Sequence, residues 1–222
     1  MLKKFHNKNL IYILKSNYCI IILIMCLISF IFLSSFSYTC AISNDLSSSV
    51  FRLHIIANSD SNEDQNLKLK VRNAILQYLN PIFSKESNLS KNEVINIVSS
   101  NLNNIRNISL KTIKDNGYNY NVEVFIGKYK FPTKNYGEIT FPSGIYDALR
   151  IVIGNGVGHN WWCVLYPSLC FSSTNDAIVP ESSKEMLSND LNTESYELVS
   201  GDNLDIKFKF KIVEIINNFI DK

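Results

Sequence analysis

Hydrophobic and polar positions divide this chain of 222 residues into one long uncharged run and a patterned remainder. Residues 16–44 carry no charged side chain, and Tyr18 to Leu33 is apolar at almost every position. As a helix, such a run is long enough to cross about 30 Å of hydrocarbon. The charged residues before it are all lysines, which predicts that the N-terminus stays in the cytoplasm and that the rest is exported.

Two fates of this segment stay open. Residues 1–15 form a basic cytoplasmic region, and residues 16–41 form either a signal peptide or a retained signal anchor. Small residues at Cys40 and Ala41 suit cleavage after Ala41, whereas the length of the apolar run favours an anchor. In both cases we expect the following domain outside the cytoplasm, either secreted or held at the membrane by the N-terminal segment.

The exported part begins with a strand pattern that leads into a helix pattern. Apolar side chains alternate from Val50 to Ala57, which puts Arg52 and His54 together on one face. Ser61 is then placed to cap a helix that we expect to end at Pro81.

A second helix and several strands follow. The capping box that begins at Ser90 predicts a helix whose apolar spacing continues to Lys114. After Gly117 the period changes from helical to alternating. The apolar runs at residues 149–153 and 161–166 are expected to be antiparallel neighbours.

These patterns predict an α+β fold, a single exported domain in which helices pack on a mostly antiparallel sheet. Residues 42–171 form its core. Residues 172–204 are polar and rich in Ser and Asn, so we expect a loop or linker there. Residues 205–222 return to strand spacing and then to helix spacing.

The net charge of the exported part differs from that of the whole chain. After Ala41 the chain carries 18 Lys and Arg against 20 Asp and Glu, although the formal charge of all 222 residues is +2. No basic stripe and no cluster of cations among aromatic residues is present, which argues against nucleic acid as a partner.

Only Cys163 and Cys170 of the five cysteines belong to the exported domain. Six residues, including Pro167, lie between them. In an exported protein this spacing is compatible with a disulfide around a tight loop. Two buried thiols are the alternative, because spacing alone does not fix the distance between the Cα atoms.

The histidines of the exported part are His54 and His159. Without HExxH, CxxC or His-rich spacing, the sequence predicts no metal site and no cofactor. Cys163 as a nucleophile with His159 as its base is weakly supported, because side chains four residues apart on an extended segment lie too far apart for a direct hydrogen bond. A cell-wall or peptide hydrolase that uses His54, His159 or Cys163, or an envelope-binding protein, stays as the alternative function.

Trp161 and Trp162 are adjacent in the strand pattern. Neighbours on a strand point to opposite sides, so we expect one ring in the core and the other available to a partner, a membrane surface or a second layer of structure.

Several blocks of the exported part resemble the stage II sporulation protein R family. They are residues 51–72, 131–137, 142–150 and 158–163, and the family has them in the same order. Together they cover most of residues 50–171, whereas residues 172–222 resemble the family only loosely.

The resemblance implies a protein made in the forespore of an endospore-forming bacterium and exported into the space between the two membranes. There it would activate a membrane-embedded aspartic protease of the mother cell, which removes the pro-segment of a sigma factor. It implies a signal rather than an enzyme and supplies no established binding residues.

We therefore expect a partner-binding site and no catalytic residues. The first candidate is the segment that contains the two tryptophans, because buried aromatic side chains dominate interface energetics. The second candidate is the corner between the first strand and the first helix of the exported part. The full candidate set is His54, Asn58, Asp60, His159, Asn160, Trp161 and Trp162.

Overall fold

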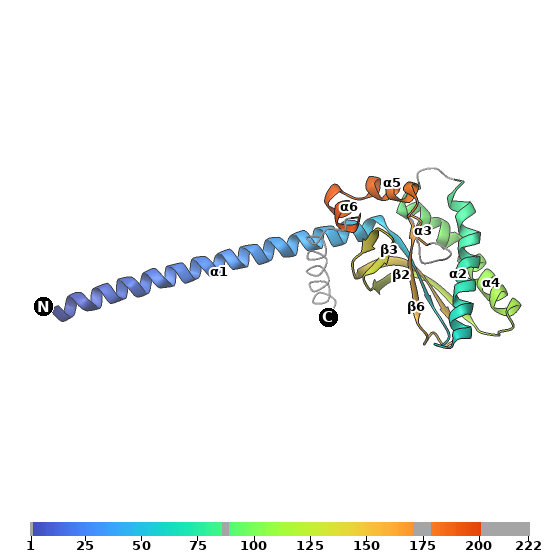
Figure 1. The fold of residues 1–222 in the computed structure, drawn as a ribbon, viewed down its shortest axis with the longest axis horizontal. Coiled ribbons are helices and arrows are strands. Elements are labelled where there is room, and N and C mark those ends of the chain that lie inside the picture. The colour runs from blue at the N-terminus through green and yellow to red at the C-terminus, as the bar shows by residue number, and fades with distance from the viewer. Residues whose placement is uncertain (1, 86–88, 171–178, 201–222) are drawn as a thin grey trace. The chain divides into compact units, whose positions relative to one another are not determined.

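The computed structural model describes residues 2–85, 89–170 and 179–200 (Figure 1). Residue contacts divide the chain into two compact units, Met1–Ala41 and Ile42–Lys222, and each is described by itself. The first unit contains most of helix α1 (Leu2–Ser49). Within this helix, Tyr18–Ser49 has the length and composition to cross a bilayer, properties that a signal sequence shares.

The second unit is built on a four-stranded sheet of order β2–β5–β1–β6. The strands are β1 (Phe51–Ile56), β2 (Val122–Phe131), β5 (Gly144–Ile153) and β6 (Asn160–Tyr166). Strand β1 runs parallel to β5 and antiparallel to β6, while β2 runs antiparallel to β5. The α+β prediction is confirmed, with a mixed sheet. The expected pairing of residues 149–153 with 161–166 is wrong, because β1 lies between them.

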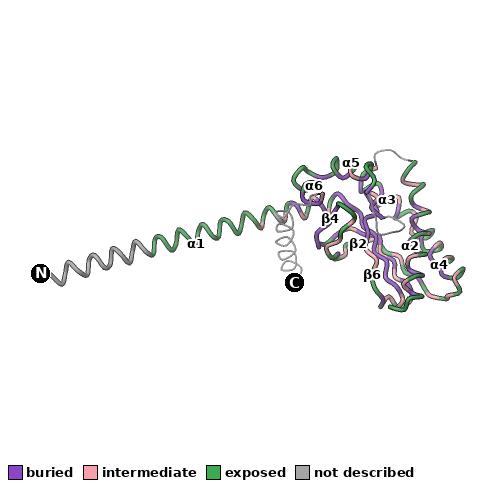
Figure 2. Tube along the Cα trace, in the orientation of Figure 1, coloured by how far each residue is buried: buried purple, intermediate pink, exposed green. Residues whose placement is uncertain are grey.

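Buried residues run through the sheet (Figure 2), and β1, one of its two inner strands, is buried at every position. Its side chains alternate as predicted. Leu53 and Ile55 belong to the main hydrophobic core, on what we call the first face of the sheet. Arg52 and His54 point to the opposite, second face.

Three helices cover the first face: α2 (Asn62–Phe83), α3 (Lys91–Ser100) and α4 (Leu102–Asp115) (Figure 1). Both predicted caps are confirmed. The Ser61 side chain accepts a hydrogen bond from the backbone of Asp64, and Ser90 forms a reciprocal capping box with Glu93. These caps satisfy backbone donors that would otherwise lack partners at the helix starts.

Two helix boundaries differ from the prediction. Helix α2 continues through Pro81 to Phe83, because a proline in the last turn removes one hydrogen bond without having to propagate a kink. The second predicted helix is divided at Asn101, whose φ of −107° and ψ of 8° are not helical. The Asn101 side chain donates to the carbonyl of Ile97 at 2.8 Å, which is how asparagine competes with helix continuation.

The second face is partly covered by a different set of elements. They are the two-stranded sheet of β3 (Lys134–Tyr136) and β4 (Ile139–Phe141), helices α5 (Glu181–Asp190) and α6 (Thr193–Ser200), and the end of α1 from Ile42 onward. A second hydrophobic cluster joins them. It contains Ile42, Leu46, Phe131, Phe141, Tyr146, Leu187 and Leu198.

The predicted loop or linker at residues 172–204 is wrong where α5 and α6 form. These helices are polar overall, but Leu187 and Leu198 are buried in the second cluster and fix them to the domain. A few widely spaced apolar side chains were too weak a periodic signal against the Ser/Asn-rich background. The strand and helix predicted at 205–222 lie outside the described residues.

The connection from β5 to β6 passes over the end of β1. The backbone N–H of Gly158 donates to the carbonyl of Ala57 at 3.0 Å. A Cβ atom at position 158 would lie 2.2 Å from the carbonyl oxygen of Ser59, so glycine is required for this approach. The crossing brings the start of β6 against the turn between β1 and α2, which places the two sequence-predicted candidate regions next to each other.

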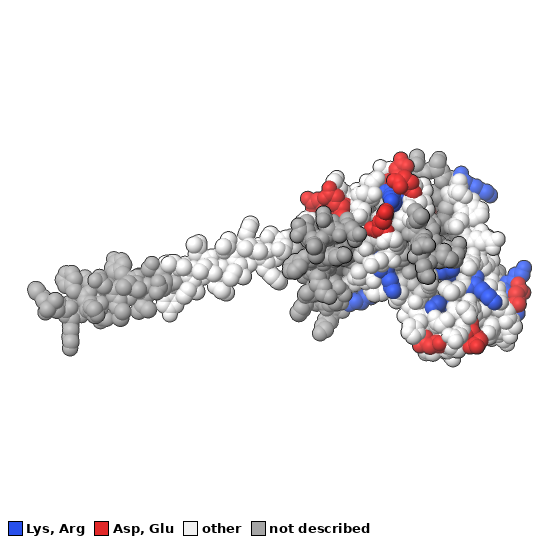
Figure 3. All heavy atoms as spheres, viewed as in Figure 1, with Lys and Arg blue, Asp and Glu red and all other residues white. Residues whose placement is uncertain are grey.

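Charged side chains of both signs lie in small groups on the surface that Figure 3 shows, among the residues it colours.

Candidate functional site

A row of side chains crosses all four strands on the second face. The register pairs Phe125 of β2 with Arg150 of β5, Arg150 with His54 of β1, and His54 with Trp162 of β6. Paired residues on adjacent strands project to the same face, so these four side chains form one continuous line. We call this line the aromatic band.

His54 and Trp162 form the centre of the band. Their rings stack with centroids 3.7 Å apart and an interplanar angle of 16°. His54 Nε2–H donates to Oδ1 of Asn160 at 2.7 Å, which holds the imidazole parallel to the indole. Burial lowers the pKa of His54 to about 4 against the opposing effect of the Asn160 hydrogen bond, and the charge of Arg150 lowers it further. The imidazole is therefore neutral at physiological pH.

Arg52 lies one row further along the same face and is completely buried. Its guanidinium carbon is 4.2 Å from the ring centroid of Phe131 and 4.7 Å from that of Tyr146. One nitrogen, Nη2, donates to the Tyr136 hydroxyl at 2.8 Å. Nε and Nη1 have no hydrogen-bond partner among the described residues, so aromatic ring faces supply much of the compensation for burying this charge.

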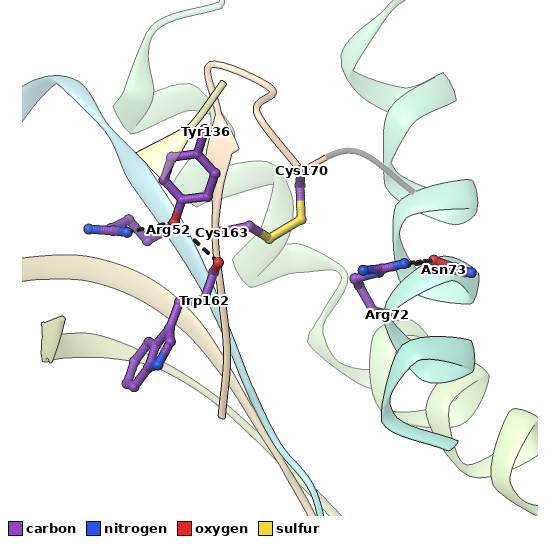
Figure 4. The surroundings of a disulfide bond; sticks show 7 residues. All are labelled: Arg52, Arg72, Asn73, Tyr136, Trp162, Cys163 and Cys170. Atoms are coloured by element: carbon purple, nitrogen blue, oxygen red, sulfur yellow. Dashed lines mark hydrogen bonds between the residues drawn. A yellow bond between two sulfur atoms is a disulfide. The ribbon is translucent and has the colours of Figure 1, made fainter. Parts of the chain in front are cut away.

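Tyr136 connects Arg52 to the edge strand β6. Its hydroxyl donates to the backbone carbonyl of Trp162 at 3.1 Å (Figure 4). This chain from Arg52 through Tyr136 to the Trp162 carbonyl, which we call the Arg52 relay, connects β1, β3 and β6. Burial raises the pKa of Tyr136 despite the opposing effect of Arg52, so the hydroxyl keeps its proton and can donate it to the carbonyl.

The two tryptophans lie on opposite faces, as the strand pattern predicts. Trp161 packs against the first-face core, and the guanidinium carbon of Arg72 from α2 lies 4.2 Å from its ring centroid. Trp162 packs beside Phe131 on the second face, with centroids 4.7 Å apart. Both side chains are only partly buried, so each serves the fold and still presents some surface.

The remaining candidates form the corner between β1 and α2. Asn58 accepts from the backbone N–H of Asn155 at 2.9 Å and donates to the Asp64 carboxylate at 2.8 Å. Asp60 accepts hydrogen bonds from both the ring and the backbone of His159, which lower the pKa of its carboxyl. The side chains of His159 and Asp60 are 78% and 54% exposed. Asn58 is thus a structural link, whereas Asp60 and His159 form a polar surface pair.

The hydrolase alternative needs side chains that the fold keeps apart. Cys163 points to the first face and forms a disulfide with Cys170, with the Cα atoms 5.3 Å apart (Figure 4). His54 points to the second face, and His159 lies at the corner. In the parts of the chain that the structure describes, no three His, Cys, Asp or Glu side chains gather as metal ligands would.

Four side chains of this region are not among the candidates predicted from the sequence: Phe125, Arg150, Arg52 and Tyr136. A signal was present, because both arginines interrupt otherwise apolar strand segments. A charge at a buried strand position needs a specific partner, which marks its surroundings as a place to examine. The partner Tyr136 is 84 residues from Arg52 in sequence, so the pairing depends on tertiary structure.

The lowered pKa of His54 makes stability depend on pH. The unfolded chain binds a proton near pH 6.5 and the folded chain only near pH 4, so the free energy of unfolding falls as pH decreases through this window. We expect a loss on the order of 2 kcal/mol between about pH 7.5 and about pH 5, measured by urea unfolding of residues 42–222. His54→Gln should lack this part of the loss. The same pH dependence in both proteins would contradict the assignment.

The disulfide can be tested by thiol titration of residues 42–222. We expect no titratable thiol in the denatured, unreduced protein and two after reduction, because this part of the chain contains only Cys163 and Cys170. Two thiols before reduction would show that the bridge does not form.

Comparison with known proteins identifies the family of this chain. The model of the stage II sporulation protein R family matches residues 47–176. Stage II sporulation protein R of Bacillus subtilis (strain 168) is 39% identical over 136 residues. The match covers 60% of this chain and 60% of the length of that relative. No solved structure matches the chain. The aromatic band, the Arg52 relay and the corner all lie within residues 47–176, and the chain belongs to the stage II sporulation protein R family.

Proposed function

We propose that this chain is an exported sporulation signal that activates a membrane-embedded aspartic protease of the mother cell. Activation leads to processing of a pro-sigma factor. The observation that carries this proposal is membership of the stage II sporulation protein R family, with the match spanning residues 47–176. The protein would be made in the forespore and act in the space between the two membranes.

The N-terminal helix supports the export step. Tyr18–Ser49 is apolar and long enough to cross a bilayer, and the charged side chains that precede residue 18 in the sequence are lysines. The folded unit begins after Ala41. In this proposal the helix either anchors that unit outside the forespore or is removed after export.

The second face supports a role in binding rather than in catalysis. His54 is neutral and is fixed by Trp162 and Asn160. Cys163 is bonded to Cys170, so it supplies no thiolate. The proposed partner-binding residues fall into two adjacent groups, namely the second-face residues His54, Asn160 and Trp162, and the corner residues Asn58, Asp60 and His159. Trp161 on the first face is the least accessible to the same partner.

The test is reconstitution in a host that does not sporulate. The host would produce the protease, its pro-sigma substrate and the full chain. We expect processing only when the full chain is present, and none with a chain that lacks residues 1–41, because that chain stays in the cytoplasm. Processing without this protein, or equal processing without residues 1–41, would remove the signalling role.

A further inference from the structure

We propose that the aromatic band binds a segment of the partner protein in which an acidic side chain is flanked by apolar ones. Arg150 pairs with the carboxylate, while Phe125 and Trp162 contact the apolar neighbours. The inference rests on the proposed function in one respect, because the partner is the protease whose activity the chain controls.

Arg150 forms no ion pair with any residue that the structure describes. It lies partly buried in the middle of the sheet, with its guanidinium carbon 5.0 Å from the ring centroid of Tyr129. Its Nε is buried and has no hydrogen-bond partner among the residues that the structure describes. Asp147 on the same strand is already paired with Lys91 at 2.6 Å. A guanidinium in this setting gains most from a carboxylate that excludes water from the pair.

The second hydrophobic cluster covers the second face only as far as the band. Ala148 and Val164, one row away, are fully buried under the second cluster. Phe125 in the band is 45% exposed, and Val157 on the adjoining β5–β6 connection is 73% exposed. Apolar surface of this kind, next to the Arg150 cation, suits a partner that brings both apolar contact and negative charge.

The charges near the band favour an acidic group on the partner. Arg52, Arg150 and Glu123 project to the second face, and the imidazole of His54 is neutral. Arg52 is completely buried and Glu123 lies at the exposed edge strand, so Arg150 is the charge inside the band. A second copy of the chain docked with its symmetry axis at the band would bring Arg150 against Arg150, and like charges in contact are repelled. The chain's own residues 201–222 lie beyond the family match, whereas the whole band lies within it. A separate, acidic partner is the occupant that fits both facts.

The first measurement is photo-cross-linking in the reconstituted host, with the full chain. Phe125 is replaced by the photoreactive residue p-benzoylphenylalanine, and Lys111, exposed on α4 over the first face, is replaced in the same way as a control. We expect position 125, but not position 111, to cross-link to the protease, and Arg150→Glu to reduce that product at least about tenfold. A product with residues 201–222, a product with a second copy, or no product from position 125 while the wild-type chain supports processing would overturn the proposal.

The second measurement is charge reversal, read as processing by the same host. Arg150→Glu should reduce processing at least about tenfold, Arg150→Lys should reduce it less because it keeps the charge, and Lys111→Glu should leave it unchanged. Substitutions in the protease that restore processing with Arg150→Glu should replace an outward-facing acidic residue by a basic one. If Arg150→Glu does not fold, processing with Arg150→Gln, which lacks the charge, is compared with processing with Arg150→Lys, which keeps it.

Wild-type processing separates the two proposals. If the wild-type chain gives no processing, the proposed function fails. If it gives processing that Arg150→Glu, exported and folded, leaves unchanged, the function stands and the binding role of the band is overturned.

Discussion

The guanidinium of Arg52 is fully buried on the inner strand β1, where a charge without compensation would cost several kcal/mol. Much of the second face is arranged around it. Phe131 and Tyr146 present their rings to it, Tyr136 accepts one of its hydrogen bonds, and the same hydroxyl fixes the carbonyl of Trp162. The small β3–β4 sheet and the edge strand β6 are thereby attached to β1 through one cation.

This arrangement gives the two faces of the sheet different tasks. The first face is apolar, covered by α2, α3 and α4, and reinforced by the disulfide, so it supplies most of the folding core. The second face contains the buried Arg52, the stacked His54 and Trp162, and the partly exposed Phe125 and Arg150. The side chains that are poorly explained by folding alone lie at the boundary where its cover ends, which is where we place the partner.

Local patterns in the sequence predicted much of the fold. The alternation along β1 correctly separated Leu53 from Arg52, and the caps at Ser61 and Ser90 correctly began two helices. Long-range pairing was harder to predict. Inserting β1 between β5 and β6 requires the close approach of Gly158, and the aromatic band requires the register of all four strands. The candidate list therefore contained His54 and Trp162 but missed Arg150 and Tyr136, whose roles depend on distant residues.

A double-mutant cycle between Arg52 and Tyr136 tests the organising role of the buried cation most directly. Arg52→Met, Tyr136→Phe and the double variant would be compared with the wild type by urea unfolding of residues 42–222. The relay predicts a coupling free energy of about 1–2 kcal/mol, because either single change leaves the other group without its partner. Additive effects, within about 0.5 kcal/mol, would show that the two side chains act independently and would contradict this account of the second face.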